Sequence, residues 1–149
     1  MYTIGQVSRL LHIPISTLRY YDRQGLFPDM TRQGGARRFS DRELEVLRLV
    51  GCLKKSGLEI RDIKQFIDWC AQGPATFAQR KALLEQQKQT VEAEIAHMEK
   101  ALDMLRYKCW YYEQALAAGT DEALRRLTPD QLPAPIRQSY IHAHQPEEP

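Results

Sequence analysis

A stretch of 44 residues, 75–118, contains neither proline nor glycine, the two residues least compatible with a helix interior. Apolar side chains recur through it at alternating spacings of four and three residues, the heptad repeat of a coiled coil. Nine of the ten repeat positions are apolar or aromatic, counting cysteine, and Lys88 is the tenth. We therefore expect one long helix that pairs with another helix. The nine positions expected at that interface are Leu84, Val91, Ile95, Met98, Leu102, Leu105, Cys109, Tyr112 and Leu116.

The partner of this helix is predicted to be a second copy of the chain, because no other long heptad segment exists in the sequence. Gly119 ends the helix. The remaining segment, 119–149, is expected to form one short helix around Asp121 to Leu127, followed by a proline-containing, flexible tail.

The first residues predict two short helices joined by a tight turn, a helix-turn-helix. Thr3 and Gln6 have the spacing of a capping box that opens the first helix, and His12 and Pro14 end it. Ser16 or Thr17 is expected to cap the second helix, which Gly25 stops. The apolar positions of the first helix are Ile4, Val7, Leu10 and Leu11.

A β-hairpin and two more helices are expected next. Gly34 and Gly35 lie between short polar arms in residues 28–39, the pattern of a hairpin turn. Ser40 and Glu43 form a second capping box, and Gly57 ends that helix. A fourth helix runs from about Ile60 to Ala71, until Gly73 and Pro74 break it. The inward positions of these helices are Leu44, Leu47, Val50, Leu53, Ile63, Phe66 and Ile67.

The predicted fold is therefore mainly α. It has three parts: a winged helix-turn-helix DNA-binding domain over 1–73, a coiled-coil dimerisation helix over 75–118, and the C-terminal segment 119–149. The charge distribution agrees, since residues 1–65 carry 12 Lys and Arg against 7 Asp and Glu, whereas residues 66–149 carry 9 against 12. A basic head suits a polyanionic partner such as DNA.

The second helix and the hairpin carry the residue types that read DNA. Small or polar residues at the start of a recognition helix reach base edges in the major groove, while arginines and hydroxyls bind phosphates. A hairpin rich in arginine can contact the backbone beside that site. The candidate DNA-binding residues are Ser16, Thr17, Arg19, Tyr20 and Arg23 on the helix and Arg32, Arg37 and Arg38 on the wing.

Several motifs, in this order and spacing, resemble the MerR family of transcription regulators. They are Thr3-Ile4-Gly5-Gln6-Val7, Thr17-Leu18-Arg19-Tyr20-Tyr21-Asp22 with Gly25-Leu26, Arg37-Arg38-Phe39-Ser40, and Gly57-Leu58-Glu59-Ile60-Arg61-Asp62-Ile63. The resemblance covers roughly residues 2–118. One departure is Phe39, where the family often has tyrosine, so a phosphate contact from that hydroxyl is lost.

The resemblance implies a homodimer, joined by an antiparallel coiled coil, that binds an inverted repeat in a promoter. It also implies that the dimer kinks and untwists this operator so that RNA polymerase can use both promoter elements. Cys52 matches the lone reactive cysteine of the electrophile- and aldehyde-responsive subgroup, and residues 107–113 look like that subgroup's coil end. Arg48 and Lys55 lie on the same helix face, and nearby cations favour a thiolate.

Alternative interpretations remain open. Cys52 can instead simply pack at the edge of the core. The effector can be a noncovalent ligand in an aromatic pocket near Trp69 and Trp110, or the chain can be a DNA-bending accessory factor without an effector. The long heptad helix argues against the accessory factor, since such proteins seldom need a dimer arm.

Other classes are disfavoured. The three cysteines are widely spaced, which argues against a disulfide framework, and no apolar run is long enough for a membrane span, so we expect a cytoplasmic protein. No cysteine occurs in 75–83 or 117–149, where metal-sensing relatives carry theirs, so no metal or cofactor is predicted. About 30 residues after the coil are too few for a drug-binding domain. An enzyme is not expected, because His12, His97, His142 and His144 bear no evident relation to a cysteine.

Overall fold

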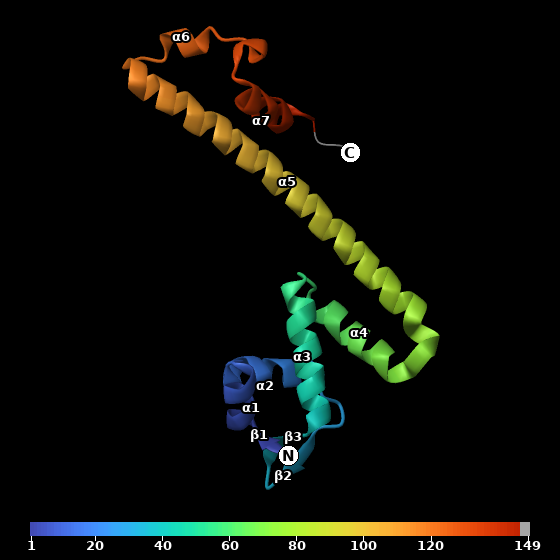
Figure 1. Ribbon diagram of the computed structural model, residues 1–149. Coiled ribbons are helices and arrows are strands. Elements are labelled where there is room, and N and C mark those ends of the chain that lie inside the picture. Colours follow the sequence, from blue (N-terminus) through green and yellow to red (C-terminus); the bar gives the residue numbers. More distant parts are fainter. Residues whose placement is uncertain (147–149) are drawn as a thin grey trace. The chain divides into compact units, whose positions relative to one another are not determined.

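The computed structural model describes residues 1–146 and is mainly helical (Figure 1). It divides into two compact units, 1–91 and 92–149, with the boundary inside the long helix. Within the described residues, no helix is long and apolar enough to cross a membrane. These units are defined by contacts within the chain. They do not test the predicted division into a DNA-binding domain, a dimerisation helix and a C-terminal segment.

The first unit begins with the predicted helix-turn-helix. Helix α1 (Ile4–Leu11) is opened by Thr3, whose side chain accepts from the Gln6 amide while the Gln6 side chain accepts from the Thr3 amide. This capping box is as predicted, and His12 ends the helix in the left-handed conformation. Helix α2 (Ile15–Arg23) begins after three intervening residues. Of the apolar positions of α1, Val7 is fully buried and Leu10 is exposed.

The expected cap of α2 was also wrong. Pro14 occupies the N-cap position and no side chain caps the helix. Because the helix begins at Ile15, Ser16 falls inside the first turn rather than before it.

The wing is a three-stranded antiparallel sheet in the order β1-β3-β2. Strands β2 (Thr31–Gln33) and β3 (Ala36–Phe39) form the predicted hairpin, and Gln33 pairs with Ala36 across the turn. Gly34 and Gly35 both have positive φ, which a tight two-residue hairpin turn requires. The third strand, β1 (Tyr2–Thr3), was not predicted, because two residues carry too little pattern. It pairs Tyr2 with Phe39 and so ties the N-terminus to the wing.

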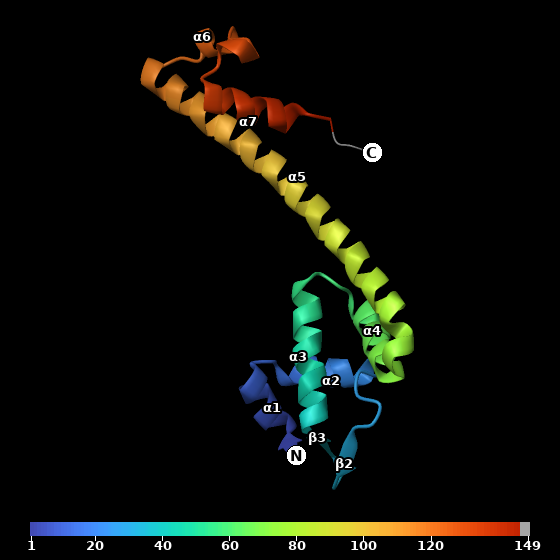
Figure 2. The same cartoon turned by 45° about the vertical axis from the view of Figure 1, so that its right-hand side comes forward.

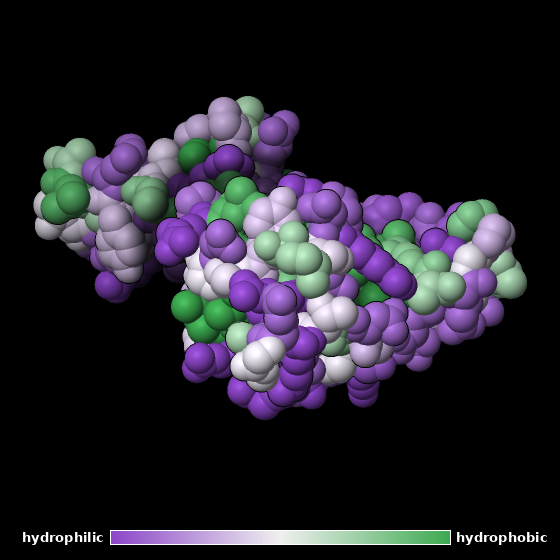
Figure 3. All heavy atoms as spheres, turned by 90° about the horizontal axis from the view of Figure 1, so that it is seen from below, coloured by the Kyte–Doolittle hydropathy of each residue, from purple (hydrophilic) through white to green (hydrophobic). Residues whose placement is uncertain are grey.

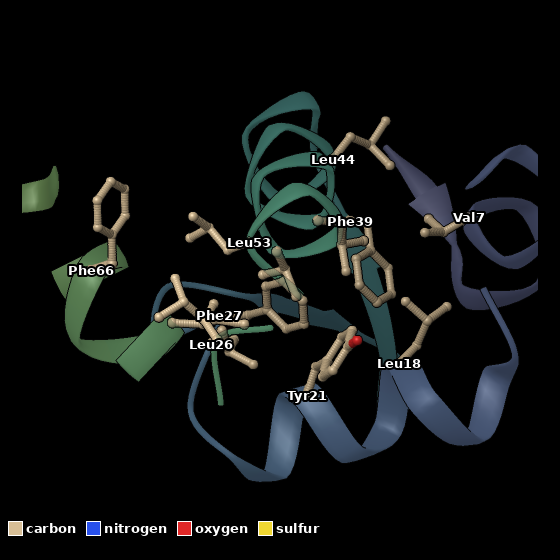
Figure 4. Close-up of a cluster of buried hydrophobic side chains, with 13 residues drawn as sticks. Val7, Leu18, Tyr21, Leu26, Phe27, Phe39, Leu44, Leu53 and Phe66 are labelled. Carbon is tan, nitrogen blue, oxygen red and sulfur yellow. The ribbon is translucent and has the colours of Figure 1, made fainter. Parts of the chain in front are cut away.

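Helices α3 (Asp41–Lys55) and α4 (Ile60–Gln72) close the hydrophobic core of the first unit. The predicted Ser40–Glu43 capping box opens α3. Leu18 and Tyr21 of α2 lie beside Phe39 of β3, and Leu53 of α3 and Leu26 extend the cluster toward Phe66 of α4 (Figure 4). Phe39 is fully buried and meets Phe27 edge to face, with ring centroids 5.7 Å apart. Burial of each such side chain stabilises the fold by about 1.5–3 kcal/mol.

Helix α5 (Phe77–Ala118) is the predicted long helix, entered through a 3-10 turn over Gly73–Thr76. None of its residues is buried in the described chain. The start of the helix belongs to the first unit, where Leu83 packs against the core.

The second unit contains the rest of α5, a short helix α6 (Glu122–Arg125) and a helix α7 (Ala134–His144). Helix α7 turns back along α5 in both views (Figures 1 and 2). The sequence predicted a flexible tail here, but residues 134–144 are helical and packed. Proline disrupts a helix interior but is tolerated where the helix begins, which is where Pro133 and Pro135 lie.

Candidate nucleic-acid interface

Helix α2 separates a buried face from an exposed one. Leu18 and Tyr21 point into the core, whereas Arg19, Tyr20 and Arg23 lie exposed. Ser16 is exposed as well, and Thr17 is half-buried. The structure therefore brings the five residues predicted on this helix to one accessible side or its edge, as a recognition helix requires.

The wing is joined to α2 by an ion pair between Arg37 and Asp22. Both side chains are mostly shielded, with 28% of Arg37 and 15% of Asp22 exposed. Arg37 is predicted to contact DNA from the wing. Its Nε is bound by Asp22, and the contact of Arg37 with DNA stays a prediction. Sequence reasoning gave Asp22 no role, although a lone acid among the cations of residues 19–23 was the available signal.

Arg32 stands directly opposite Arg37 in the hairpin register. Like charges at opposed positions repel each other, and Asp22 compensates only Arg37. Arg32 is exposed on β2, near the turn at Gly34 and Gly35. Its charge is therefore the more accessible of the two, and a phosphate would relieve the repulsion between them.

Arg38 points to the opposite face of β3 from Arg37 and Phe39, because side chains alternate along a strand. Its Nε is buried and has no hydrogen-bond partner within the described residues. A buried donor without a partner is costly, so this guanidinium favours an added acceptor.

Seen from below, the surface is largely hydrophilic with scattered apolar patches (Figure 3).

Cys52 lies exposed near the end of α3. Its carbonyl accepts from the Ser56 hydroxyl at 3.1 Å. Arg48, expected beside the thiol, pairs with Glu45 instead. Cys70 and Cys109 are also free thiols, and no cluster of three or more metal-ligating residues occurs in the part of the chain that the structure describes.

The heptad positions of α5 form an exposed stripe, which we call the heptad face. Between 40% and 84% of the side chain is exposed at Leu84, Ile95, Met98, Leu102, Leu105, Tyr112 and Leu116. Cys109 is exposed and Val91 is half-buried. Cys109 is predicted to be buried in a coiled coil between two copies. A single chain contains only one helix of that coil, so its exposure here does not test the prediction.

Two open hollows lie on α5. One, of about 290 Å³, is lined by Tyr112, Leu116 and Gly119 among others, and the other, of about 530 Å³, by Phe77, Leu84 and Lys88 among others. Both include heptad positions. Trp110 stacks on Tyr107 at 6.4 Å and lines neither of these hollows.

Helix α7 is held on α5 by Asp103. This carboxylate accepts from Ser139 and contacts the His142 ring, both on α7, and it also pairs with Arg106. The hydrogen bond from His142, followed by those from Ser139 and Arg106, lowers the pKa of Asp103 to about 2. Tyr107 meets Tyr140 edge to face at 5.0 Å. The covered face of α5 is thus different from the heptad face.

A second polar cluster fastens the start of the C-terminal segment. Tyr111 donates to Asp121 at 2.7 Å, and Arg125 also donates to that carboxylate. The hydrogen bond to Asp121 raises the pKa of Tyr111. The same bond lowers the pKa of Asp121.

Comparison with known proteins agrees with this arrangement. Residues 2–68 match the profile described as "MerR HTH family regulatory protein", and residues 44–107 match "MerR, DNA binding". An uncharacterized HTH-type transcriptional regulator of Haemophilus influenzae is 38% identical over 124 residues, which cover 83% of this chain and 92% of that protein.

Two solved structures are similar. HiNmlR, a MerR family regulator lacking the sensor domain and crystallised on promoter DNA, is 38% identical with a TM-score of 0.63, covering 82% of this chain and 98% of that one. A MerR family regulator from Bacillus thuringiensis is 44% identical with a TM-score of 0.59, covering 72% and 96%. The chain belongs to the MerR family of DNA-binding transcription regulators, and is not an enzyme.

Proposed function

We propose that this chain acts as a homodimer, and the observation that carries the proposal is the exposed heptad face of α5. An apolar stripe of this length is rarely left open to water. Helix α7 covers a different face of α5 and leaves the stripe free. A second copy would cover it.

An antiparallel pair that uses all ten heptad positions sets Leu84 of one copy against Leu116 of the other, and Met98 beside Leu102. Lys88 then stands opposite Tyr112. The aromatic segment from Tyr107 to Tyr112 of one copy would thus come close to the head of the other, which supports contact with the region around Cys52.

The dimer is proposed to read an inverted-repeat operator in a promoter through two copies of α2. Ser16, Thr17, Arg19, Tyr20 and Arg23 would contact bases and phosphates, while Arg32 and Arg38 contact the backbone from the wing. Arg37 would mainly hold the wing against α2 through Asp22. DNA-bound HiNmlR, which this chain covers almost entirely, supports the placement of the head on promoter DNA.

Activation is proposed to work through the shape of the DNA. The dimer would bend and untwist the operator so that RNA polymerase engages both promoter elements. A bend of 40–90° costs about 1–6 kcal/mol, which contacts along the wings and recognition helices would offset.

Cys52 is proposed as the sensor of reactive electrophiles. With an aldehyde, the thiolate sulfur attacks the carbonyl carbon, the C=O π bond breaks, and the oxygen takes up a proton to give a hemithioacetal. The exposed position of Cys52 allows access to such a reagent. The pairing of Arg48 with Glu45 leaves Lys55 as the nearby cation on the helix.

The test is a promoter reporter for the adjacent genes, challenged with formaldehyde in wild-type, Cys52→Ser and Cys109→Ser forms. We expect induction in wild type and in Cys109→Ser, and none in Cys52→Ser. Full induction of Cys52→Ser would refute the thiol sensor and favour a noncovalent ligand. Cys109→Ser is the matched control because it removes a different free thiol, which the proposed dimer would cover.

A further inference from the structure

One face of the first part of α5 is seated on the head. The Arg80 guanidinium donates to the Gly73 carbonyl at 2.7 Å and lies 3.7 Å from the Cys70 sulfur at the end of α4. Leu83 packs against the hydrophobic core. Gln87 follows four residues later on the same side of the helix. We call this set, Arg80, Leu83 and Gln87, the seated face.

Gln87 reaches the end of α3. Its Nε2 donates to the Ser56 carbonyl at 2.8 Å, across 31 residues of sequence. Ser56 is the C-cap of α3, where carbonyls lack partners within the helix. The bond thus gives one of these carbonyls a donor from another element. Gly57 makes room for it, since a Cβ there would lie 2.9 Å from Gln87 Nε2.

Cys52 lies one turn before this contact. Its carbonyl accepts from both the amide and the hydroxyl of Ser56, at 3.2 and 3.1 Å. An unbroken series of hydrogen bonds therefore runs from Cys52 through Ser56 to Gln87. Residues 84, 88 and 91 of the heptad face lie on the same two turns of α5 as Gln87.

We propose that Gln87 is the positioning residue that couples the Cys52 end of α3 to the dimerisation helix. The inference rests on the proposed sensor role of Cys52. An adduct at Cys52 adds bulk one turn before Ser56 and would shift the last turn of α3. Because Gln87 binds the Ser56 carbonyl at that helix end, the shift would pass to α5 and from there to the heptad face.

The experiment measures hydrogen exchange in purified full-length protein before and after alkylation with N-ethylmaleimide. In this reaction the thiolate sulfur bonds to one alkene carbon, the C=C π bond breaks, and the other carbon takes up a proton. Gln87→Leu removes the donor, whereas Gln87→Lys keeps one and places a cation at a helix C-terminus, which is favourable. Gln89→Leu is the matched control, because Gln89 is an exposed glutamine on the same helix.

In wild type, alkylation is expected to change the rate of amide hydrogen exchange in residues 84–91 by about fivefold. The same change is expected in Gln87→Lys and Gln89→Leu. In Gln87→Leu it should stay confined to α3, while operator affinity remains within about threefold, since residue 87 lies outside α2 and the wing. A change in residues 84–91 of Gln87→Leu that equals wild type would overturn the coupling.

The Cys52→Ser variant separates this inference from the proposed function. No change in α5 of Cys52→Ser is expected on alkylation. If the change persists there, it originates at another thiol, and the sensor role fails along with the coupling. If the exchange change in α5 is lost in Cys52→Ser but persists in Gln87→Leu, the sensor role of Cys52 stands and only the coupling through Gln87 fails.

Discussion

Arg37 of β3 and Asp22 of α2 form an ion pair that fastens the wing to the recognition helix. The pair also neutralises one of two arginines that face each other across the hairpin. The orientation of the wing thus depends on an acid in the middle of an otherwise cationic surface. The first prediction follows from this pair.

Asp22→Ala should loosen the wing. Because both side chains are mostly shielded, we expect a loss of about 1 kcal/mol in the free energy of unfolding, measured by urea denaturation. Amides of β2 and β3 should exchange faster. Asp29→Ala is the control, since the pair of Asp29 with Arg42 is largely exposed and its loss should change stability by less than about 0.5 kcal/mol. Equal effects of the two changes would contradict the account.

Arg19→Ala and Arg32→Ala should have different effects on DNA binding. If Arg19 contacts a base edge, its loss should cost about 1–3 kcal/mol of operator binding and relax specificity at one position. If Arg32 contacts a phosphate, its loss should weaken binding to all sequences and reduce the salt dependence by about one unit of slope. Titration of operator and scrambled DNA at several salt concentrations distinguishes them, and undiminished binding by Arg19→Ala would refute the assignment of α2.

Ile95→Glu should yield a monomer. The change places a charge in the middle of the heptad face, where a coil would bury it without a partner. Sedimentation velocity should give a dimer for wild type and a monomer for Ile95→Glu. Ala96→Glu adds the same charge beside the heptad face and should remain dimeric. A dimeric Ile95→Glu protein would exclude this face as the interface.

Asp103 should titrate far below an ordinary aspartate. Its folded-state pKa of about 2 lies below the usual aspartate value of 3.8. The attachment of α7 is therefore strongest above pH 3.8 and weakens as the pH falls toward 2. NMR titration of the Asp103 carboxyl measures this directly. His142→Ala should raise the pKa more than Ser139→Ala, because His142 contributes the largest lowering. An unchanged Asp103 pKa in both variants would contradict the proposed contacts of Asp103 with α7.

The sequence predicted those elements whose signals are local. The capping boxes at Thr3 and Ser40 and the glycine pair of the hairpin each act within four residues, so their patterns could be read directly. Helix α5 was predictable because nothing interrupts it. The exposed heptad face then agrees with the predicted spacing, while its pairing remains a prediction.

Contacts between distant segments could not be read in this way. Strand β1 exists because Tyr2 finds Phe39, and α7 is attached because Ser139 and His142 find Asp103. The pairing of Asp22 with Arg37 and of Gln87 with Ser56 also joins different elements. The spacing of such residues in the sequence does not tell how close they lie in the folded chain. The roles of the DNA-facing side chains and of Cys52 remain predictions.

Recognition of specific DNA by a dimer is the central claim, and selection from a pool of random duplexes tests it most directly. Purified full-length protein should enrich an inverted repeat, and should bind it at physiological salt about 10³-fold or more tightly than a scrambled duplex. Enrichment of no common sequence, or of a single half-site bound by one copy, would contradict the claim.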